Sequence, residues 1–246
     1  MARSLWHRLF GAPNFLRRLQ WPVIADLLQL EPGQVILDLG CGDLQLSAEL
    51  AKRDVGAVIA TDASPRLGSL GYVARQLPHL RLVRADGARL PLADASVDRV
   101  LASSVLQMVP DPGVLLAECR RVLKPTGRLV LTVPDAYRYF RRLFTDKEQR
   151  AALNRMFGVE GAGYLTEGEL TSLLRRAGFQ PAARARSPGR VGTLIWETSL
   201  ALTYRLRDSR LPMLLAFAFY PLGLLGRLEK NPTQGCELLM AATPHA

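Results

Sequence analysis

A glycine-rich turn and a carboxylate beside it are the residues of this chain best suited to ligand chemistry. The turn, Gly40-Cys41-Gly42, follows the apolar run Val35-Ile36-Leu37, and Asp38 stands two residues before its first glycine. Glycine lets a backbone approach a ligand without a Cβ in the way. We expect the helix after the turn to direct its free N–H groups and its positive dipole end toward that ligand.

The residues around this turn discriminate between ligands. A dinucleotide fingerprint has a third glycine three residues after Gly42, where this chain has Gln45. The Gly-Lys-Ser/Thr ending of a phosphate-binding loop is absent. The carboxylate of Asp38 suits a ligand with hydroxyl and ammonium donors better than one with phosphates. S-adenosylmethionine has a cationic aminocarboxypropyl tail, a sulfonium and two ribose hydroxyls, so it fits.

Two further acids follow later apolar runs. Asp62 directly follows the run 57–61 and precedes Ala63, and Asp86 directly follows the run 80–85. An acid at the first of these positions can accept both ribose hydroxyls, as in other nucleoside sites. An acid at the second can accept from an adenine amino group, while a nearby backbone N–H donates to a ring nitrogen. Three acids at successive strand ends, with the glycine turn, indicate an adenosyl-ligand site.

These residues need a parallel sheet to position them. Short apolar and β-branched runs alternate with helical patterns, which predicts right-handed crossovers and a doubly wound, mostly parallel α/β sheet. We predict strands at 35–37, 57–61, 80–85, 97–102, 128–133, 180–186 and 237–242, and helices at 44–52, 65–76, 112–123 and from Thr166 to Gly178. Thr166 and Glu169 form a capping-box pattern.

Residues 35–134 resemble a class I methyltransferase domain of the ubiquinone/menaquinone-biosynthesis type. The segment Ala85–Val100 follows the third-motif pattern of that family, and Arg121–Leu129 follows its usual turn before the fifth strand. Tyr164–Phe179 resembles the family less strongly. The resemblance implies a seven-stranded, Rossmann-like sheet whose last strand is antiparallel, with S-adenosylmethionine as the methyl donor.

The resemblance also implies roles for individual residues. The methionine part of the cofactor would be held by the first acid and its turn, the ribose by the second acid, the adenine by the third, and the sulfonium side would be lined by the end of the fourth strand. In chain order these cofactor residues are Asp38, Gly40, Cys41, Gly42, Asp62, Ala63, Asp86, Gly87, Ala88 and Ser103. Two departures stand out. The third glycine of the family's turn is Leu44 here, which we expect to narrow the turn, and a frequent His-His pair is replaced by Gln107-Met108.

Methyl transfer needs a general base only when the acceptor must lose a proton. The cofactor supplies the reactivity, and the protein aligns nucleophile, methyl group and sulfur. Candidate bases lie in the irregular segment 135–165, which follows the fifth strand and should form a substrate cap: Tyr137, Tyr139, Glu160 and Tyr164. No cluster of histidines or carboxylates predicts a metal site, and we expect none.

Composition bounds the class of protein. The 246 residues are 48% hydrophobic and 22% charged, as expected of a globular chain with one large domain and an appendage. The net charge of +10 comes from scattered arginines, and no nucleic-acid-binding motif is present, so we do not expect nucleic acid as a partner. Three scattered cysteines predict neither a disulfide framework nor a zinc site and favour a reduced, cytoplasmic compartment.

Two segments flank the predicted sheet. Residues 1–30 interleave arginine with aromatic and aliphatic residues and predict an amphipathic helical lead, broken near Pro13, ahead of a methyltransferase domain at 31–246. An apolar helical insert at 189–232 includes the uncharged run 211–226, which is shorter than the about 20 residues that span a bilayer and contains two prolines. We interpret the lead as a lid and the run as a cap or dimer interface; contact with an anionic membrane surface is the alternative for both.

The sequence favours a methyltransferase with a small or lipid-linked hydrophobic acceptor over three alternatives. An NAD(P)-dependent oxidoreductase conflicts with Gln45 and with the missing Ser/Tyr-Lys pattern. A methyltransferase-like module that binds S-adenosylmethionine without turnover fits the departures at Leu44 and Gln107-Met108. An RNA methyltransferase lacks its Asn/Asp-Pro-Pro-aromatic motif. The chain itself could act as a monomer or a homodimer.

Overall fold

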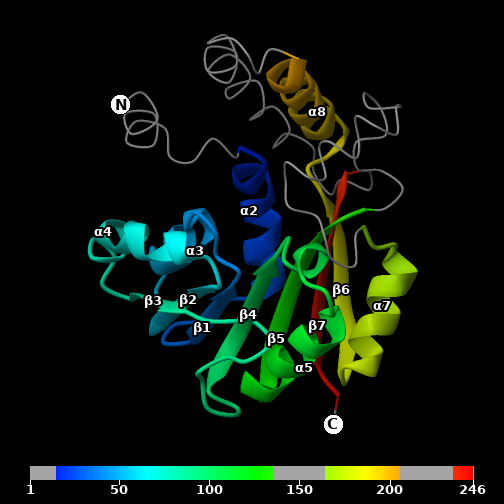
Figure 1. Cartoon of the computed structure of the whole chain (residues 1–246). Helices are drawn as coiled ribbons and strands as arrows, with labels where there is room; N and C mark the ends of the chain where they lie inside the picture. Colours follow the sequence, from blue (N-terminus) through cyan, green and yellow to red (C-terminus); the bar gives the residue numbers. More distant parts are fainter. Residues whose placement is uncertain (1–14, 136–163, 206–234, 246) are drawn as a thin grey trace.

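The sheet predicted from the alternating pattern is present. The structure, a computed structural model, describes residues 15–135, 164–205 and 235–245. Its described residues form a seven-stranded sheet in the order β3-β2-β1-β4-β5-β7-β6, with helices on both faces (Figure 1). Strand β7 runs antiparallel to both of its neighbours, and the other paired strands are parallel. The fold class is therefore the one expected.

The strand order reverses between β1 and β4, which pair with each other near the middle of the sheet. The strands are β1 (Val35–Leu39), β2 (Ala57–Asp62), β3 (Leu80–Arg84), β4 (Val97–Ser103), β5 (Leu123–Pro134), β6 (Phe179–Ser187) and β7 (Glu237–Pro244). Open α/β sheets bind ligands outside the carboxyl ends of their strands at such a reversal. In Figure 1 this edge faces α8, and the C-terminus lies at the opposite end of the sheet.

The helices in the described part of the chain are α2 (Phe15–Leu28), α3 (Gln45–Ala51), α4 (Gly71–Ala74), α5 (Pro112–Val122), α7 (Glu167–Arg176) and α8 (Arg190–Arg205). The helices predicted at 44–52, at 112–123 and from Thr166 to Gly178 are present as α3, α5 and α7, with bounds that differ by a few residues at most. The Asp111 side chain caps α5 by accepting from two backbone N–H groups of its first turn. Both hydrogen bonds of the predicted capping box of Thr166 and Glu169 are present at the start of α7.

Two local predictions were wrong. The helix expected at 65–76 is a 3₁₀ segment, Pro65–Leu70, followed by the four-residue α4, because two glycines and a serine within it favour a helix poorly. Strand β5 begins at Leu123 rather than after a turn at 124–127. Its register with β4 shifts between Val97 and Arg99, so the pairing accommodates the extra residues.

Helix α2 covers one half of the sheet. It packs against β5, β6 and β7 and also contacts α3 and α8. Its buried Ile24 and Leu28 share a core cluster with Val130 and Leu239. Buried Arg99 of β4 donates to the carbonyls of Leu28 and Gln29 at 2.7 and 3.0 Å, which satisfies the last carbonyls of the helix.

The insert between β6 and β7 begins with α8, which agrees with the helical insert predicted at 189–232. Residues 206–234, which include the apolar run, and residues 1–14, which include the proline break of the lead, lie outside the described residues. Within the described ranges, none of the helices is both long and apolar enough to cross a membrane.

Candidate functional site

The ends of β1, β2 and β3 meet at one edge of the sheet. The Gly42 N–H donates to the Asp62 carboxylate at 2.9 Å, which joins the glycine turn to the end of β2. The Ala85 N–H donates to the Asp62 carbonyl at 3.2 Å, which joins the end of β2 to the residue before Asp86. The three acids predicted from the sequence therefore border one contiguous region.

The turn needs its first glycine for two reasons. Gly40 has φ +68°, and a Cβ there would stand 2.4 Å from a methyl carbon of Val105. Gly42 has φ +54°, and a Cβ there would meet no atom within 4 Å. The backbone at Gly42 is therefore bare and faces open space, as close approach of a ligand requires.

Leu44 adopts the left-handed conformation that the missing glycine would favour. Its φ is +65°, yet its side chain is only 1% exposed and belongs to the core cluster beneath α2 and α3. The expectation that Leu44 narrows the turn was wrong, because the side chain points into the core. Burial of a leucine offsets the roughly 1–2 kcal/mol that this backbone conformation costs.

Asp38 lies deeper than a surface acid. It is 2% exposed, and its carboxylate accepts a hydrogen bond from the Ser47 hydroxyl on α3 at 2.5 Å. Burial raises the pKa of Asp38 to about 6, while the Ser47 hydrogen bond and the nearby Arg17 guanidinium act in the opposite direction. A cationic ligand group beside this carboxylate would favour its charged form.

The other two acids are more accessible and shape their own turns. Asp62 is half-buried and accepts from the Ser64 N–H at 2.8 Å, and Ala63 after it is exposed. Asp86 is exposed, and its carboxylate accepts from the Ala88 N–H at 2.9 Å. The Ala88 amide is thus bonded to Asp86 here.

Helix α3 follows the glycine turn directly. It has seven residues, and its N-cap, Leu44, offers no side-chain cap. The Cys41 thiol is buried, and burial raises its pKa far above the ordinary value, so it stays protonated. Its backbone N–H donates to the Thr61 carbonyl at 2.9 Å. Cys41 therefore holds the turn through its backbone and packs in the core through its side chain.

A buried polar network occupies the next part of the edge, at the ends of β4, β5 and β7. The Ser103 hydroxyl lies 2.9 Å from that of Thr132 and accepts from the Arg17 guanidinium at 2.6 Å. The Glu237 carboxylate accepts from the Gln20 amide at 2.8 Å and from the Ser104 hydroxyl at 3.4 Å. Arg17 and Gln20 come from α2, so the helix closes this network from one side.

Sequence reasoning missed Arg17, Gln20 and Glu237. Glu237 is 1% exposed although it begins a strand, and an acid at the start of a predicted strand gives no sign of burial. The two α2 residues stand four and one positions before the buried Trp21 in an arginine-rich lead. One signal was available: Gln20 interrupts the apolar side of that helix.

The predicted catalytic residues fall largely outside the described part of the chain, since Tyr137, Tyr139 and Glu160 lie in 136–163. Tyr164 is half-buried, and burial, together with the negative charge of Glu237, raises its pKa to about 12. A phenol with that pKa is protonated at neutral pH and is a poor base. Of the pair that replaces two histidines, Gln107 is buried and Met108 is exposed.

Comparison with known proteins finds a likeness to one family over part of the chain. Residues 37–131 match the family model of a methyltransferase domain. This stretch, which is less than half of the chain, is similar to that domain. The methyl donor that this family implies is S-adenosylmethionine. Its groups match the residues described above: the carboxylates of Asp62 and Asp86 suit hydroxyl and amino donors, and that of Asp38 suits an ammonium group. The bare backbone at Gly42 leaves room for the ligand. The described residues hold no cluster of histidine, cysteine and acidic side chains suited to a metal ion.

Two curated relatives illustrate the likeness. A demethylmenaquinone methyltransferase of Renibacterium salmoninarum is 36% identical over 52% of this chain and 54% of its own length. A 27-O-demethylrifamycin SV methyltransferase of Amycolatopsis mediterranei is 27% identical over 90% of this chain and 81% of its own. Across several other curated relatives, the chain spans between a third and about half of their length.

Solved structures share the fold of this chain over most of its length. An S-adenosylmethionine-dependent methyltransferase from Mesorhizobium loti has a TM-score of 0.62 at 21% identity, covering 92% of this chain and 97% of that one. The 4+2 cyclase SpnF has a TM-score of 0.64 at 20% identity, covering 93% and 81%. At these identities the likeness establishes the fold alone.

Proposed function

We propose that this protein transfers the methyl group of S-adenosylmethionine to a small or lipid-linked hydrophobic acceptor. The observation that carries the proposal is the joining of three strand ends by the Gly42–Asp62 and Ala85–Asp62 hydrogen bonds. That arrangement gathers two accessible carboxylates, one buried carboxylate and a bare backbone at the strand-order reversal, where such sheets bind ligands.

The cofactor would be held residue by residue along this edge. Asp38 accepts from the ammonium group, Asp62 from the ribose hydroxyls, and Asp86 from the adenine amino group, while Gly40, Cys41 and Gly42 supply backbone. Ala63, Gly87 and Ala88 line the nucleoside, and Ser103 the sulfonium side. When bound, S-adenosylmethionine supplies an electrophilic methyl group on a sulfonium leaving group.

The polar network beyond Ser103 suits the acceptor side. Ser104 is half-buried, has φ +53°, and directs its hydroxyl to the Glu237 carboxylate. Backbone strain of this kind is concentrated at functional sites. For an acceptor that carries a hydroxyl, we propose that Ser104 contacts it and that its proton passes through Ser104 to Glu237. The oxygen freed in this way would be the nucleophile to which bound S-adenosylmethionine would supply its methyl group.

The acceptor class rests on sequence and on the relatives. The names of the relatives refer to a demethylmenaquinone and a demethylrifamycin, which are organic molecules rather than macromolecules. In the sequence, the apolar run 211–226 and the amphipathic lead favour a hydrophobic acceptor. They also favour a cytoplasmic protein that contacts a membrane surface peripherally. Of the base candidates Tyr137, Tyr139, Glu160 and Tyr164, only Tyr164 lies among the described residues.

One observation favours a second candidate function. SpnF shares this fold but is named a cyclase, so the fold also serves reactions other than methyl transfer. A chain that binds the cofactor without transferring its methyl group would match the loss of the His-His pair at Gln107-Met108.

Calorimetry and transfer assays separate these functions. We expect the purified chain to bind both S-adenosylmethionine and S-adenosylhomocysteine, and to move a radiolabelled methyl group onto a component of a lipid extract. Binding without transfer to any fraction would favour the second candidate, and no binding of either compound would contradict both. Flotation with anionic vesicles tests the membrane contact separately, because a chain that stays unbound at low salt contradicts it.

A further inference from the structure

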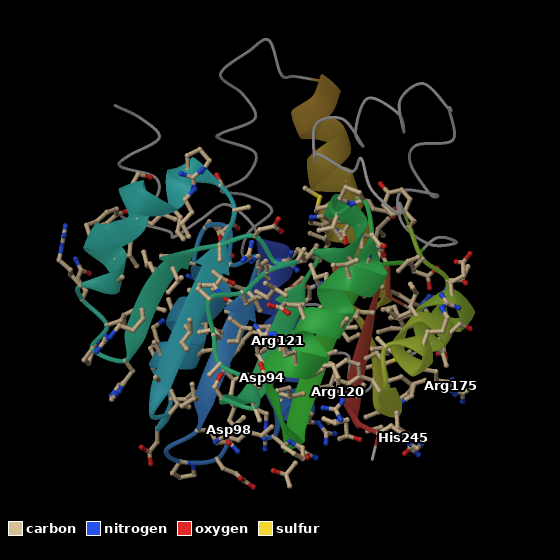
Figure 2. The ribbon with its side chains drawn as sticks, turned by 60° about the horizontal axis from the view of Figure 1, so that its bottom comes forward. Asp94, Asp98, Arg120, Arg121, Arg175 and His245 are labelled. Carbon is tan, nitrogen blue, oxygen red and sulfur yellow. The ribbon has the colours of Figure 1, made fainter. Side chains whose placement is uncertain are left out.

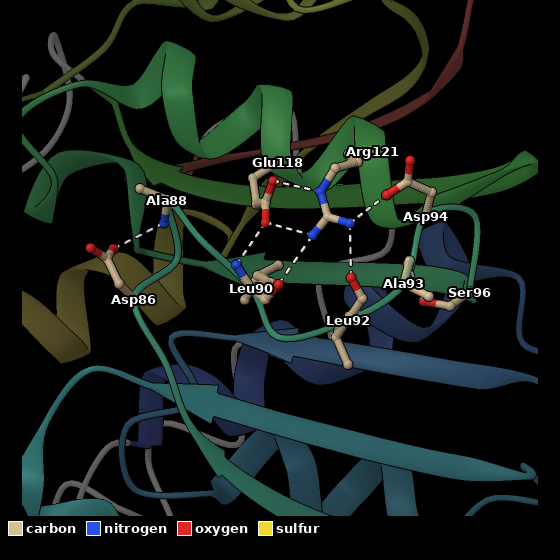
Figure 3. Close-up of polar contacts among 9 residues, drawn as sticks. All are labelled: Asp86, Ala88, Leu90, Leu92, Ala93, Asp94, Ser96, Glu118 and Arg121. Atoms are coloured by element: carbon tan, nitrogen blue, oxygen red, sulfur yellow. Dashed lines mark hydrogen bonds and ion pairs between the residues drawn. The ribbon is translucent and has the colours of Figure 1, made fainter.

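The loop between β3 and β4 carries the proposed adenine-binding residues. It runs from residue 85 to residue 96 and crosses from the sheet edge at β3 past β2 and β1 to β4 without a helix of its own. Its backbone polar groups therefore lack the regular pairing that a crossover helix would give them. Figure 3 shows that two side chains of α5, Glu118 and Arg121, take over much of that pairing.

The Arg121 guanidinium binds the loop at three points. It donates to the carbonyls of Leu90 and Leu92 at 3.1 and 2.8 Å and to the Asp94 carboxylate at 2.6 Å. The Arg121 carbonyl in turn accepts from the Ala95 N–H at 2.9 Å. One residue of α5 thus fixes the second half of the loop.

Glu118 completes the arrangement, which we call the α5 clamp. Its carboxylate accepts two hydrogen bonds from Arg121, at 2.9 and 2.7 Å, in a bidentate pair one helical turn apart. The same carboxylate accepts from the Leu90 N–H at 2.6 Å. The Arg121 hydrogen bonds hold the pKa of Glu118 below its ordinary value, so the clamp is charged at neutral pH.

The clamp lies directly behind the adenine-binding turn. Leu90 is buried, and the clamp bonds both its N–H and its carbonyl. Four residues earlier, Asp86 closes the turn by accepting from Ala88 and, through its carbonyl, from Arg89. Gly87 packs against α5, where the Leu115 methyl lies 3.1 Å from the position that a Cβ would take. The turn therefore has α5 on one side and its own clamped end on the other.

We propose that Arg121, with Glu118, is a positioning residue that holds Asp86, Gly87 and Ala88 in the conformation that recognises adenine. Neither Arg121 nor Glu118 is among the residues proposed to hold the cofactor. It raises affinity because a loop that already populates its binding conformation does not have to be ordered by the ligand. This inference rests on the proposed function.

The test compares two neighbouring arginines of α5. Figure 2 shows Arg121 beside Asp94 and Arg120 on the side of His245, whose carbonyl accepts from Arg120 at 3.3 Å. Arg121→Met removes the clamp, and Arg120→Met removes an equal charge and a similar side chain from the same helix. Arg121→Lys restores a cation that can reach one carbonyl but cannot form the bidentate pair.

Calorimetry with S-adenosylhomocysteine gives the first readout. We expect Arg121→Met to weaken binding about tenfold, which corresponds to about 1.4 kcal/mol. Arg121→Lys should recover part of this loss, and Arg120→Met should bind within about twofold of the wild-type chain. Melting curves establish that each variant is folded, and Glu118→Gln replaces Arg121→Met if the latter does not fold.

Discrimination between bases gives a second readout, which a general loss of stability would not change. S-inosylhomocysteine has a carbonyl in place of the adenine amino group, so it lacks the amino donor proposed to bind Asp86. We expect the wild-type preference for the adenine compound to fall at least about threefold in Arg121→Met.

A folded Arg121→Met protein with wild-type affinity and wild-type base preference overturns the positioning role. A wild-type chain that binds neither compound contradicts the proposed function, and the positioning role with it. The two failures are therefore distinguishable.

Discussion

Two halves of the same sheet edge are built in different ways. In the half formed by β1, β2 and β3, the contacts are local: Ser47 bonds Asp38 from nine positions away, and Gly42 bonds Asp62 from twenty. In the half formed by β4, β5 and β7, Gln20 reaches Glu237 across 217 positions. Local turns and acids define the proposed cofactor half, whereas distant segments meet to form the proposed acceptor half.

This difference predicts that the two halves can be damaged independently. Glu237→Gln keeps the size of the side chain and its capacity to accept from Gln20, but removes the negative charge. Loss of a general base commonly lowers turnover by about 100-fold or more, so we expect a drop of about 100-fold. Affinity for S-adenosylhomocysteine should stay within about twofold, because Glu237 lies outside the cofactor half. Transfer of labelled methyl groups and calorimetry measure the two quantities.

Two companion variants sharpen this prediction. Ser104→Ala should also lower turnover, because it removes the hydroxyl between acceptor and carboxylate. Glu49→Gln, on the outer surface of α3 beside Lys52, should leave turnover unchanged. Wild-type turnover in folded Glu237→Gln would show that the network is structural and that the acceptor half needs no base there.

The reverse prediction concerns Asp62. Asp62→Ala removes the proposed ribose acceptor and the bond that joins the glycine turn to β2. Hydrogen bonds to charged groups contribute about 1.5–3 kcal/mol each, so we expect affinity for S-adenosylhomocysteine to fall about 30-fold. Asp54→Ala is the matched control, because Asp54 is exposed and precedes the opposite end of β2. Equal affinities of the two variants in calorimetry would contradict the assignment of Asp62.

The same contrast explains what the sequence could predict. The capping box at Thr166 and the acids at three strand ends depend on short-range patterns that are visible in the sequence itself. The seven-stranded sheet with its antiparallel last strand was implied instead by the family resemblance. The network of Arg17, Gln20 and Glu237 depends on where α2 packs, which no local pattern encodes. Leu44 shows a further limit, because its type indicated neither its left-handed backbone nor its burial.

Leu44 allows a test of the cofactor half that does not involve the ligand. Leu44→Gly restores the residue that the backbone favours and relieves about 1 kcal/mol of conformational cost. It also removes a buried leucine, and truncating such a side chain commonly costs about 2–5 kcal/mol. Packing should therefore dominate, and urea denaturation should show a net loss of about 2 kcal/mol. A more stable variant would mean that the turn, rather than the core, decides this position.

The smallest expected effect joins stability to function at Asp38. Burial raises the pKa of this carboxyl from 3.8 to about 6, so the folded chain binds its proton more tightly than the unfolded chain does. The stabilisation from this site is complete below pH 4 and is lost as the pH rises through 6. At pH 7 the ionised group destabilises the ligand-free protein by up to about 3 kcal/mol.

Asp38→Asn removes that ionisation but keeps a buried polar amide that still has to be satisfied. We therefore expect a net gain of about 1 kcal/mol at pH 7 and a flatter stability profile between pH 4 and pH 6, measured by denaturation across that range. Binding of S-adenosylmethionine should weaken in the same variant, because the ammonium group loses its negative partner. A stable variant with full affinity would show that Asp38 serves only Ser47 and the core, and the acid nearest the turn would then have no part in holding the cofactor.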